Sequence, residues 1–391
     1  MTKISTLITR TKLIATGGVS RIIISLNSVI VSFVVIRWQS TELWGGVVPY
    51  LLFLDIGFSV IAWGATPFLI REFSFHPKDI KSIWVRSFCS RSPLLILFLS
   101  IILFSSFTSD IKIILAVWAV ARYIYHSFEP LIQFERKFNF SLMIELLGLV
   151  AFLISIFLFS VKIEHNTIIL FLTGSMLLKA ILSIILFRSS LKIEWPQKAY
   201  FLAAFPFLLL TFSAMLQQRA DLYCVAYFLP KADTAKYQVF INLLIFAQFL
   251  ASLLLSPFAK NIFRLSKHSL LKLERRFIIQ GIPLSGISIL GVFILMKFLY
   301  HLELSSTMYL LGFFYILVFY TYLLKNYELG KSKQQIKVSV FSFASSMVNI
   351  ILSIWLTPLL HLEGALIAGL AGQLFITLLY NYKSIQVYAS R

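Results

Sequence analysis

Residues 139–161 read NFSLMIELLGLVAFLISIFLFSV and carry one ionisable side chain, that of Glu145. A run of this length and composition matches the roughly 20 apolar residues that an α-helix needs to cross the hydrocarbon core of a bilayer. Inside hydrocarbon the backbone must satisfy its own N–H and C=O groups, so the run is predicted to be a helix. This segment therefore indicates an all-α membrane protein.

The rest of the chain repeats this pattern. Of its 391 residues, 59% are hydrophobic, 13% are charged and 38 are Phe, whereas an ordinary soluble domain is about 45–50% apolar. A soluble core of this size cannot hide so much apolar surface, so a soluble protein is excluded. Twelve spans would use roughly 240 of the 391 residues, which leaves no room for a second, soluble domain. Apolar runs predict about twelve membrane-spanning helices, near 15–36, 43–70, 88–107, 111–133, 139–161, 166–187, 199–223, 236–259, 277–299, 304–325, 337–356 and 364–382.

The formal net charge is +19, from 35 Lys and Arg against 16 Asp and Glu. Most of the basic residues fall in alternate connections between the expected spans. Basic connections are typical of the cytoplasmic side, so we expect both termini to lie in the cytoplasm. The membrane accounts for the charge without a nucleic-acid partner. Cys89 and Cys224 are too few for a disulfide framework, and we expect no metal and no cofactor because no motif for either is present.

A weak internal repeat indicates two halves. Thr66-Pro67-Phe68 ends the second expected span, and Ser256-Pro257-Phe258 ends the eighth, about half a chain later. Each half holds an even number of spans, so the two copies share one orientation in the membrane. We expect two six-helix lobes, residues 1–192 and 193–391.

Four basic residues stand at least four residues from either end of an expected span and are taken as intramembrane: Arg21, Arg122, Lys179 and Arg219. A charge at mid-span costs at least about 2.5–3.5 kcal/mol on insertion scales, so it usually faces a wet cavity or a partner. Arg21 begins a polar helix face continued by serines, although it also lies near enough to the cytoplasmic end to reach the headgroups. Lys179 has no acid within a helical turn, so it needs water, a partner from another helix or an anionic ligand.

Acidic residues stand beside two of these bases. Glu129 shares a helix face with Arg122, either as part of a self-contained ion pair or in the lining of a cavity in which the acid titrates. Asp221 follows Arg219 but points about 200° away from it, at about 100° per residue. The two are therefore not a simple intrahelical pair, and bonding to other helices is the alternative. Asp55, Glu129 and Asp221 are the ion-coupling candidates.

The four bases together predict the chemistry of the ligand. If they converge, the middle of the protein is cationic and wet, and its natural ligand is an anion. Phosphate fits, because an Arg guanidinium offers a bidentate fork and a Lys ammonium a point charge. A membrane-dissolved substrate with a diphosphate matches both this charge and the apolar surroundings. We therefore assign substrate binding to the four bases.

Four segments spread over nearly the whole chain share a further pattern. They are ELWGGVVPYLLFLDIG at 42–57, FEPLIQFERKF at 128–138, QRAD at 218–221 followed by AKY at 235–237, and EGALIAG at 363–369. The pattern resembles polysaccharide-export flippases of the MATE-like (MOP) superfamily, and the Wzx type in particular. One departure is that no mid-span base follows Arg219, so a substrate groove is expected to be more basic on its N-terminal side.

The resemblance implies a MATE-like flippase fold of two lobes around a central cavity. It implies transport of undecaprenyl-diphosphate-linked O-antigen or a related repeat unit, from the cytoplasmic to the periplasmic leaflet, by alternating access. Its implied partners are this lipid-linked glycan, the bilayer, a glycan polymerase and a chain-length regulator.

Two other functions stay open. A MATE-type cation-coupled drug or metabolite antiporter has the same fold with the opposite ligand charge, and it predicts acids as the dominant cavity groups. A membrane glycan polymerase or glycosyltransferase needs catalytic groups on a substantial outer loop. Here the outer acids are dispersed one per loop, without the spacing of a carboxylate pair. We therefore expect a transporter and not an enzyme.

Overall fold

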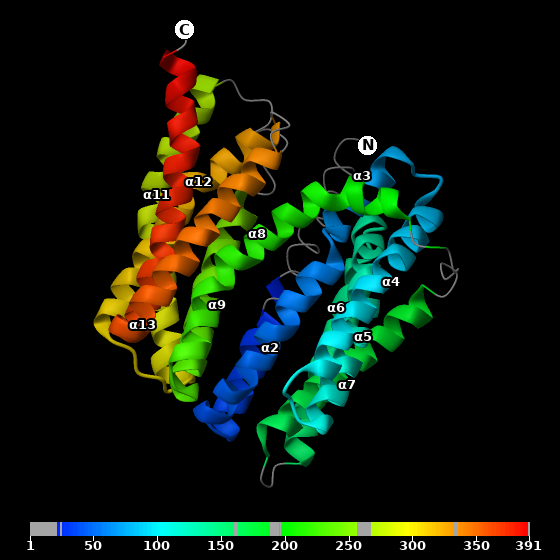
Figure 1. Cartoon of the computed structure of the whole chain (residues 1–391). Coiled ribbons are helices and arrows are strands. Elements are labelled where there is room, and N and C mark those ends of the chain that lie inside the picture. Colours follow the sequence, from blue (N-terminus) through cyan, green and yellow to red (C-terminus); the bar gives the residue numbers. More distant parts are fainter. Residues whose placement is uncertain are drawn as a thin grey trace, which may run out of the picture. The chain divides into compact units, whose positions relative to one another are not determined.

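The computed structural model describes residues 22–23, 26–159, 163–187, 195, 197–255, 267–331 and 335–389, which form helices and connecting turns. The apolar helix Leu26–Trp38 comes first. The labelled helices (Figure 1) are α2 (Thr41–Ala62), α3 (Ala65–Phe75), α4 (Ile80–Phe104), α5 (Ser109–Phe134), α6 (Phe138–Leu158), α7 (His165–Leu186), α8 (Lys198–Phe228), α9 (Lys231–Leu255), α11 (Lys267–Ile294) with the π-helical turn η3 (Leu295–Leu299), α12 (Ser306–Lys331) and α13 (Gln335–Ala389).

The prediction of an all-helical, multi-pass membrane protein is confirmed. Within the described residues, 10 helical stretches are long and apolar enough to cross a membrane. The last stretch contains two expected spans, because α13 is interrupted at His361, where φ is 52°. The helix Leu26–Trp38 lies largely within the first expected span. The expected count of about twelve membrane-spanning helices is therefore approximate, and the orientation of the chain in the membrane stays a prediction.

The chain divides into two compact units. Unit 1 comprises Met1–Val34 and Pro49–Phe212, and unit 2 comprises Val35–Val48 and Ser213–Arg391. Three of the described helices have residues in both units: Leu26–Trp38, α2 and α8. The expected lobe boundary at residue 192 stays a prediction.

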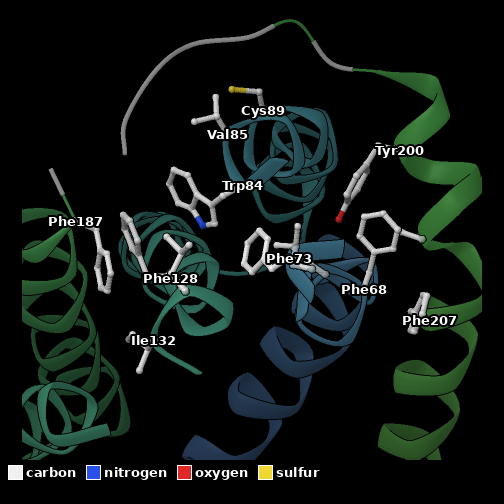
Figure 2. Close-up of a cluster of buried hydrophobic side chains, with 14 residues drawn as sticks. Phe68, Phe73, Trp84, Val85, Cys89, Phe128, Ile132, Phe187, Tyr200 and Phe207 are labelled. Carbon is white, nitrogen blue, oxygen red and sulfur yellow. The ribbon is translucent and has the colours of Figure 1, made fainter. Parts of the chain in front are cut away.

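Unit 1 is built around α5, which packs against α3, α4, α6 and α7. Figure 2 shows an aromatic core to which α3, α4, α5 and α8 contribute. Trp84 stacks on Phe128 with ring centroids 4.9 Å apart, and its Nε1 donates a hydrogen bond to the Ser127 carbonyl at 2.6 Å. Lipid tails are as apolar as this core, so close packing and such hydrogen bonds hold the helices together more than the hydrophobic effect does.

A sharp break at Trp63 and Gly64 separates α2 from α3 inside the expected span 43–70. Both residues have positive φ, 46° and 65°. A Cβ on Gly64 would lie 2.4 Å from the Leu208 backbone nitrogen, so only glycine permits this approach to α8. Trp63 Nε1 donates to the Phe201 carbonyl at 3.1 Å and holds the strained residue in place. The break therefore ties the end of α2 to the first part of α8 within unit 1.

Unit 2 centres on α12, which packs against α9, α11 and α13. Val318 and Tyr322 on α12 form an apolar cluster with Ile376 and Tyr380 on α13. This places the second half of α13 against α12, and Phe341 from the first half of α13 packs against the same cluster.

Candidate functional site

The predicted base Arg122 lies on α5 and pairs with Asp55 on α2, where Nη1 is 2.7 Å from Oδ1. The guanidinium also lies over the Phe58 ring, 4.5 Å from its centroid. Asp55 and Phe58 are three residues apart and so share one face of α2. The side chains of Arg122 and Asp55 are 20% and 29% exposed. The pair is thus open to the surroundings and not sealed in the packing of unit 1.

Two more ionisable side chains continue the face of α5 that carries Arg122. His126 Nδ1 lies 3.4 Å from Glu129 Oε2, and the imidazole packs against Phe58 with ring centroids 4.8 Å apart. Gln133 Nε2 donates to Glu129 Oε1 at 3.0 Å. We call the group formed by α2 and α5 the α2–α5 site; its members are Asp55, Phe58, Arg122, His126 and Glu129.

The α2–α5 site carries no excess of positive charge while its histidine is neutral. Asp55 and Glu129 supply two carboxylates and Arg122 one guanidinium, and His126 adds a positive charge only when protonated. Arg122 Nε is buried and has no hydrogen-bond acceptor, which leaves a costly donor unsatisfied. The site can therefore bind a cation at its carboxylates, or an oxygen-bearing anion at Arg122 if the surrounding side chains move to uncover the unsatisfied Nε.

Lys179 lies in a different setting, a buried network to which four helices of unit 1 contribute. Its Nζ lies 2.6 Å from Glu145 Oε2, which joins α7 to α6. Tyr125 OH donates to Glu145 Oε1 at 2.5 Å, and Asn27 Nδ2 donates to Oε2 at 2.9 Å. Glu145 is thus a partner from another helix, one of the three possibilities that the sequence left open for the lysine. The negative charge of Glu145 balances the positive charge of Lys179. The role of Lys179 in substrate binding stays a prediction.

Unit 2 holds Arg219 and Asp221 on the last part of α8. Arg219 Nη1 donates to Asn242 Oδ1 at 2.6 Å. Asp221 is 1% exposed; its Oδ2 accepts a hydrogen bond from Tyr237 OH at 2.5 Å and its Oδ1 accepts one from the Leu222 backbone N–H at 2.9 Å. Both side chains therefore bond to the same helix, α9, although they point about 200° apart on α8.

The predicted bases do not all belong to one unit. Arg122 and Lys179 lie in unit 1 and bond to different carboxylates, whereas Arg219 lies in unit 2. Arg21 is outside the described residues. Convergence of the four bases in one cavity stays a prediction.

Arg91 is a buried base that sequence reasoning missed. Arg91 lies inside the helix α4, near the start of the expected span 88–107, and is 2% exposed. Its Nε donates to the Ser87 carbonyl at 3.2 Å, and its Nη2 donates to Ser127 Oγ at 3.1 Å. The serines around Arg91 are the one feature of the sequence that indicates a buried position. Small side chains leave space for the long arginine side chain to reach backbone carbonyl oxygens.

A polar seam on the first half of α13 was also missed. Its members lie on one helix face and are almost fully buried: Ser339, Ser342, Ser346, Asn349 and Ser353. Ser346 Oγ donates to the Ser213 carbonyl on α8 at 3.1 Å. The spacing of three and four residues is the signal for this face, and small polar side chains allow membrane helices to approach closely.

No protein-family model and no curated protein matches this chain. Solved structures do match it. An inward-facing multidrug resistance MATE family transporter of the MOP superfamily aligns with a TM-score of 0.63 at 10% identity, over 93% of this chain and 95% of that one. An outward-facing multidrug resistance MATE family transporter of the same superfamily aligns with a TM-score of 0.64 at 12% identity, over 97% and 96%.

A MOP superfamily transporter from Pyrococcus furiosus aligns with a TM-score of 0.53 at 12% identity, over 97% of this chain and 96% of that one. Identity this low shows the fold alone, and that fold is the MATE-like one that the sequence resemblance implies.

Proposed function

We propose that this protein carries an undecaprenyl-diphosphate-linked oligosaccharide, such as an O-antigen repeat unit, from the cytoplasmic to the periplasmic leaflet by alternating access. The observation that supports this function best is Arg122, a partly exposed guanidinium on a membrane-spanning helix with a buried Nε donor that lacks an acceptor. Charges at such positions usually serve a substrate or ion pathway, because they are expensive to keep there. A MATE-like transporter fold is compatible with this cargo.

Arg122 binds the diphosphate by exchanging partners. Asp55 pairs with Nη1, while Nε is left without an acceptor. A phosphate group presents oxygens that accept two parallel N–H···O bonds from one guanidinium, so it can take Nε together with a terminal nitrogen. Asp55 then stands in for the ligand when the cargo is absent and keeps the charge of Arg122 paired.

The neighbours of Arg122 suit the glycan. Glu129, Gln133 and His126 supply donors and acceptors along α5, which sugar hydroxyls need when they leave water. The prenyl tail stays in the lipid. The inside-negative membrane potential favours outward movement of an anion by about 2.3 kcal/mol per charge per 100 mV.

A cation-coupled drug or metabolite antiporter is the second candidate, and the charge balance of the α2–α5 site favours it. Asp55 and Glu129 are two acids against one permanent base, and a cationic ligand can replace Arg122 at Asp55. Two of the matching structures are multidrug resistance transporters, and the Pyrococcus furiosus protein is described as having a binding pocket of reverse polarity. The fold therefore does not decide the sign of the ligand charge.

The same two substitutions distinguish the candidates, because the expected effects have opposite signs. If the cargo is a lipid diphosphate, Arg122→Gln weakens the binding of undecaprenyl diphosphate about tenfold through the loss of charge-assisted hydrogen bonds, and Asp55→Asn strengthens it by freeing the guanidinium. If the cargo is a cation, Asp55→Asn weakens the binding of rhodamine 6G and Arg122→Gln strengthens it. Binding is measured on purified protein in nanodiscs.

Lys112→Gln is the matched control, because it removes a positive charge from the same helix about 15 Å along its axis from Arg122. It should leave the binding of both probes unchanged. Translocation of lipid-linked oligosaccharide in proteoliposomes then tests transport directly. Diphosphate binding that is unchanged in both the Arg122→Gln and the Asp55→Asn proteins would rule out the proposed cargo.

Asp221, Glu129 and Asp55 are the proposed ion-coupling residues. Asp221 has the strongest support, because its buried carboxylate is hydrogen-bonded by neutral donors, the Tyr237 hydroxyl and the Leu222 N–H. We place the protein in a bacterial inner membrane with both termini in the cytoplasm. A glycan polymerase and a chain-length regulator are its proposed protein partners.

A further inference from the structure

The helix α2 is continuous from Thr41 to Ala62, yet its residues fall into two units. The residues up to Val48 group with unit 2, and those from Pro49 onward group with unit 1. One unbroken helix with residues in two compact bodies must bend if either body moves relative to the other. The features on each side of Val48 indicate where it bends.

The first two turns of α2 are firmly packed in unit 2. Trp44 is 2% exposed, and its Nε1 donates to Gln238 Oε1 on α9 at 2.9 Å. Val47 and Val48 are also fully buried. A buried indole whose N–H has a partner is an effective anchor, because it combines a large contact area with a directional bond.

Gly45 brings the backbone of α2 into direct contact with α9. A Cβ at this position would lie 1.7 Å from the Lys231 carbonyl oxygen and 2.4 Å from its carbonyl carbon. These atoms are backbone and belong to the first residue of α9, so they have little freedom to move aside. Every other residue at position 45 would therefore push the start of α2 off α9.

Pro49 is the first residue beyond this anchor. It lies inside the helix and is exposed. A proline has no N–H for the carbonyl four residues earlier, which here is that of Gly45, and its ring clashes with that carbonyl. Proline is accordingly one of the recognised causes of helix bending. The weakest point of α2 thus coincides with the boundary between the units.

We infer that α2 is a hinged lever: the segment 41–48 is a fixed anchor on α9, Pro49 is the hinge, and the segment 49–62 moves with unit 1. The moving segment carries Asp55, so the lever moves the α2–α5 site as one piece with its unit. The purpose of the lever rests on the proposed alternating access, but its mechanics do not depend on the identity of the cargo.

Double electron–electron resonance, which measures the distance between two spin labels, tests the hinge on the full chain in nanodiscs. Spin labels are attached at Val60→Cys in the moving segment and at Leu310→Cys on α12, because both positions are exposed. The native Cys89 and Cys224 are buried and react less readily with the label. We expect two distance populations in the otherwise wild-type chain. Pro49→Ala should lower the minor population about tenfold, since it restores the helical hydrogen bond and removes the ring clash.

Two controls isolate the hinge. Pro93→Ala removes an exposed in-helix proline from α4, which lies wholly in unit 1, and should leave both populations unchanged. A label pair inside unit 1, Val60→Cys with Ile113→Cys, should give one distance with or without Pro49. Gly45→Val tests the anchor: by displacing the start of α2 it should spread the Val60 to Leu310 distances into a broad distribution.

A single wild-type population, or a distribution that Pro49→Ala leaves unchanged, overturns the hinge. A Gly45→Val distribution as narrow as that of the wild type overturns the anchor. If α2 bends at Pro49 but Arg122→Gln and Asp55→Asn do not alter diphosphate binding, the lever stands and the proposed cargo fails. If Arg122→Gln and Asp55→Asn alter diphosphate binding but Pro49→Ala does not alter the distances, the proposed cargo stands and the lever fails.

Discussion

Lys179 Nζ and Glu145 Oε2 lie 2.6 Å apart where each residue is less than a tenth exposed. Tyr125 and Asn27 donate to the same carboxylate. An ion pair enclosed in this way ties α6 to α7, and a ligand would have to break it to reach the lysine. It contrasts with the Arg122 and Asp55 pair, which is partly exposed on both sides.

Lys179→Met should destabilise the protein by about 3–5 kcal/mol, because it leaves Glu145 buried without a counter-charge. The double substitution Lys179→Met with Glu145→Gln should lose clearly less than the sum of the two single losses. Thermal unfolding of the purified protein, followed by intrinsic fluorescence, gives the comparison. Additive losses would contradict the coupling. Lys137→Met breaks the more exposed pair with Glu135 and should cost under about 1 kcal/mol.

Gly64→Ala should destabilise unit 1 by at least about 2 kcal/mol. The added Cβ would meet the Leu208 nitrogen at 2.4 Å, and φ at this position is 65°, which an alanine rarely adopts. Gly174→Ala is the matched control, because no atom lies within 4 Å of its Cβ position on α7. Removing a helical glycine there should be neutral or stabilise by up to about 1 kcal/mol. Equal unfolding temperatures for the two variants would contradict the account of the break.

Tyr237→Phe should lower the free energy of unfolding by about 1–3 kcal/mol, because it removes a hydrogen bond to the buried Asp221 carboxylate. Denaturation in detergent measures the loss. Tyr227→Phe serves as the control, since this tyrosine is 82% exposed at the end of α8 and should change stability by no more than about 0.5 kcal/mol.

Asp221→Asn separates coupling from structure. The amide oxygen can still accept the Tyr237 hydroxyl, but the amide NH2 then faces the Leu222 N–H without accepting from it, so stability should fall by about as much as in Tyr237→Phe. If Asp221 couples transport to an ion, the variant keeps diphosphate binding but loses the response of transport to an imposed proton or sodium gradient. Flux measured in proteoliposomes with and without each gradient decides this. A gradient response equal to that of the wild type removes Asp221 from the coupling candidates.

The helical content and the membrane class follow from composition and run length, and the structure confirms them. Helix ends were harder to predict. The expected span 88–107 is part of the longer α4, because Ile80 to Ser87 carry polar and basic residues that a membrane-based reading assigns to a connection. The break at Trp63 and Gly64 has no signal of its own in an apolar run. The need for glycine at this position follows only from the structure, in which the backbone of α8 comes into contact with Gly64.

By itself the sequence determined that this chain spans a membrane as a helical bundle, and which charges share a helix face. Both follow from physics local to one helix: the solvation of backbone groups in lipid and the 3.6-residue period. Only the tertiary structure decided which charges meet, Arg122 with Asp55 and Lys179 with Glu145, since these partners stand on different helices. Such pairs depend on how helices pack and rotate against one another, and this is set by side-chain shape across the whole unit.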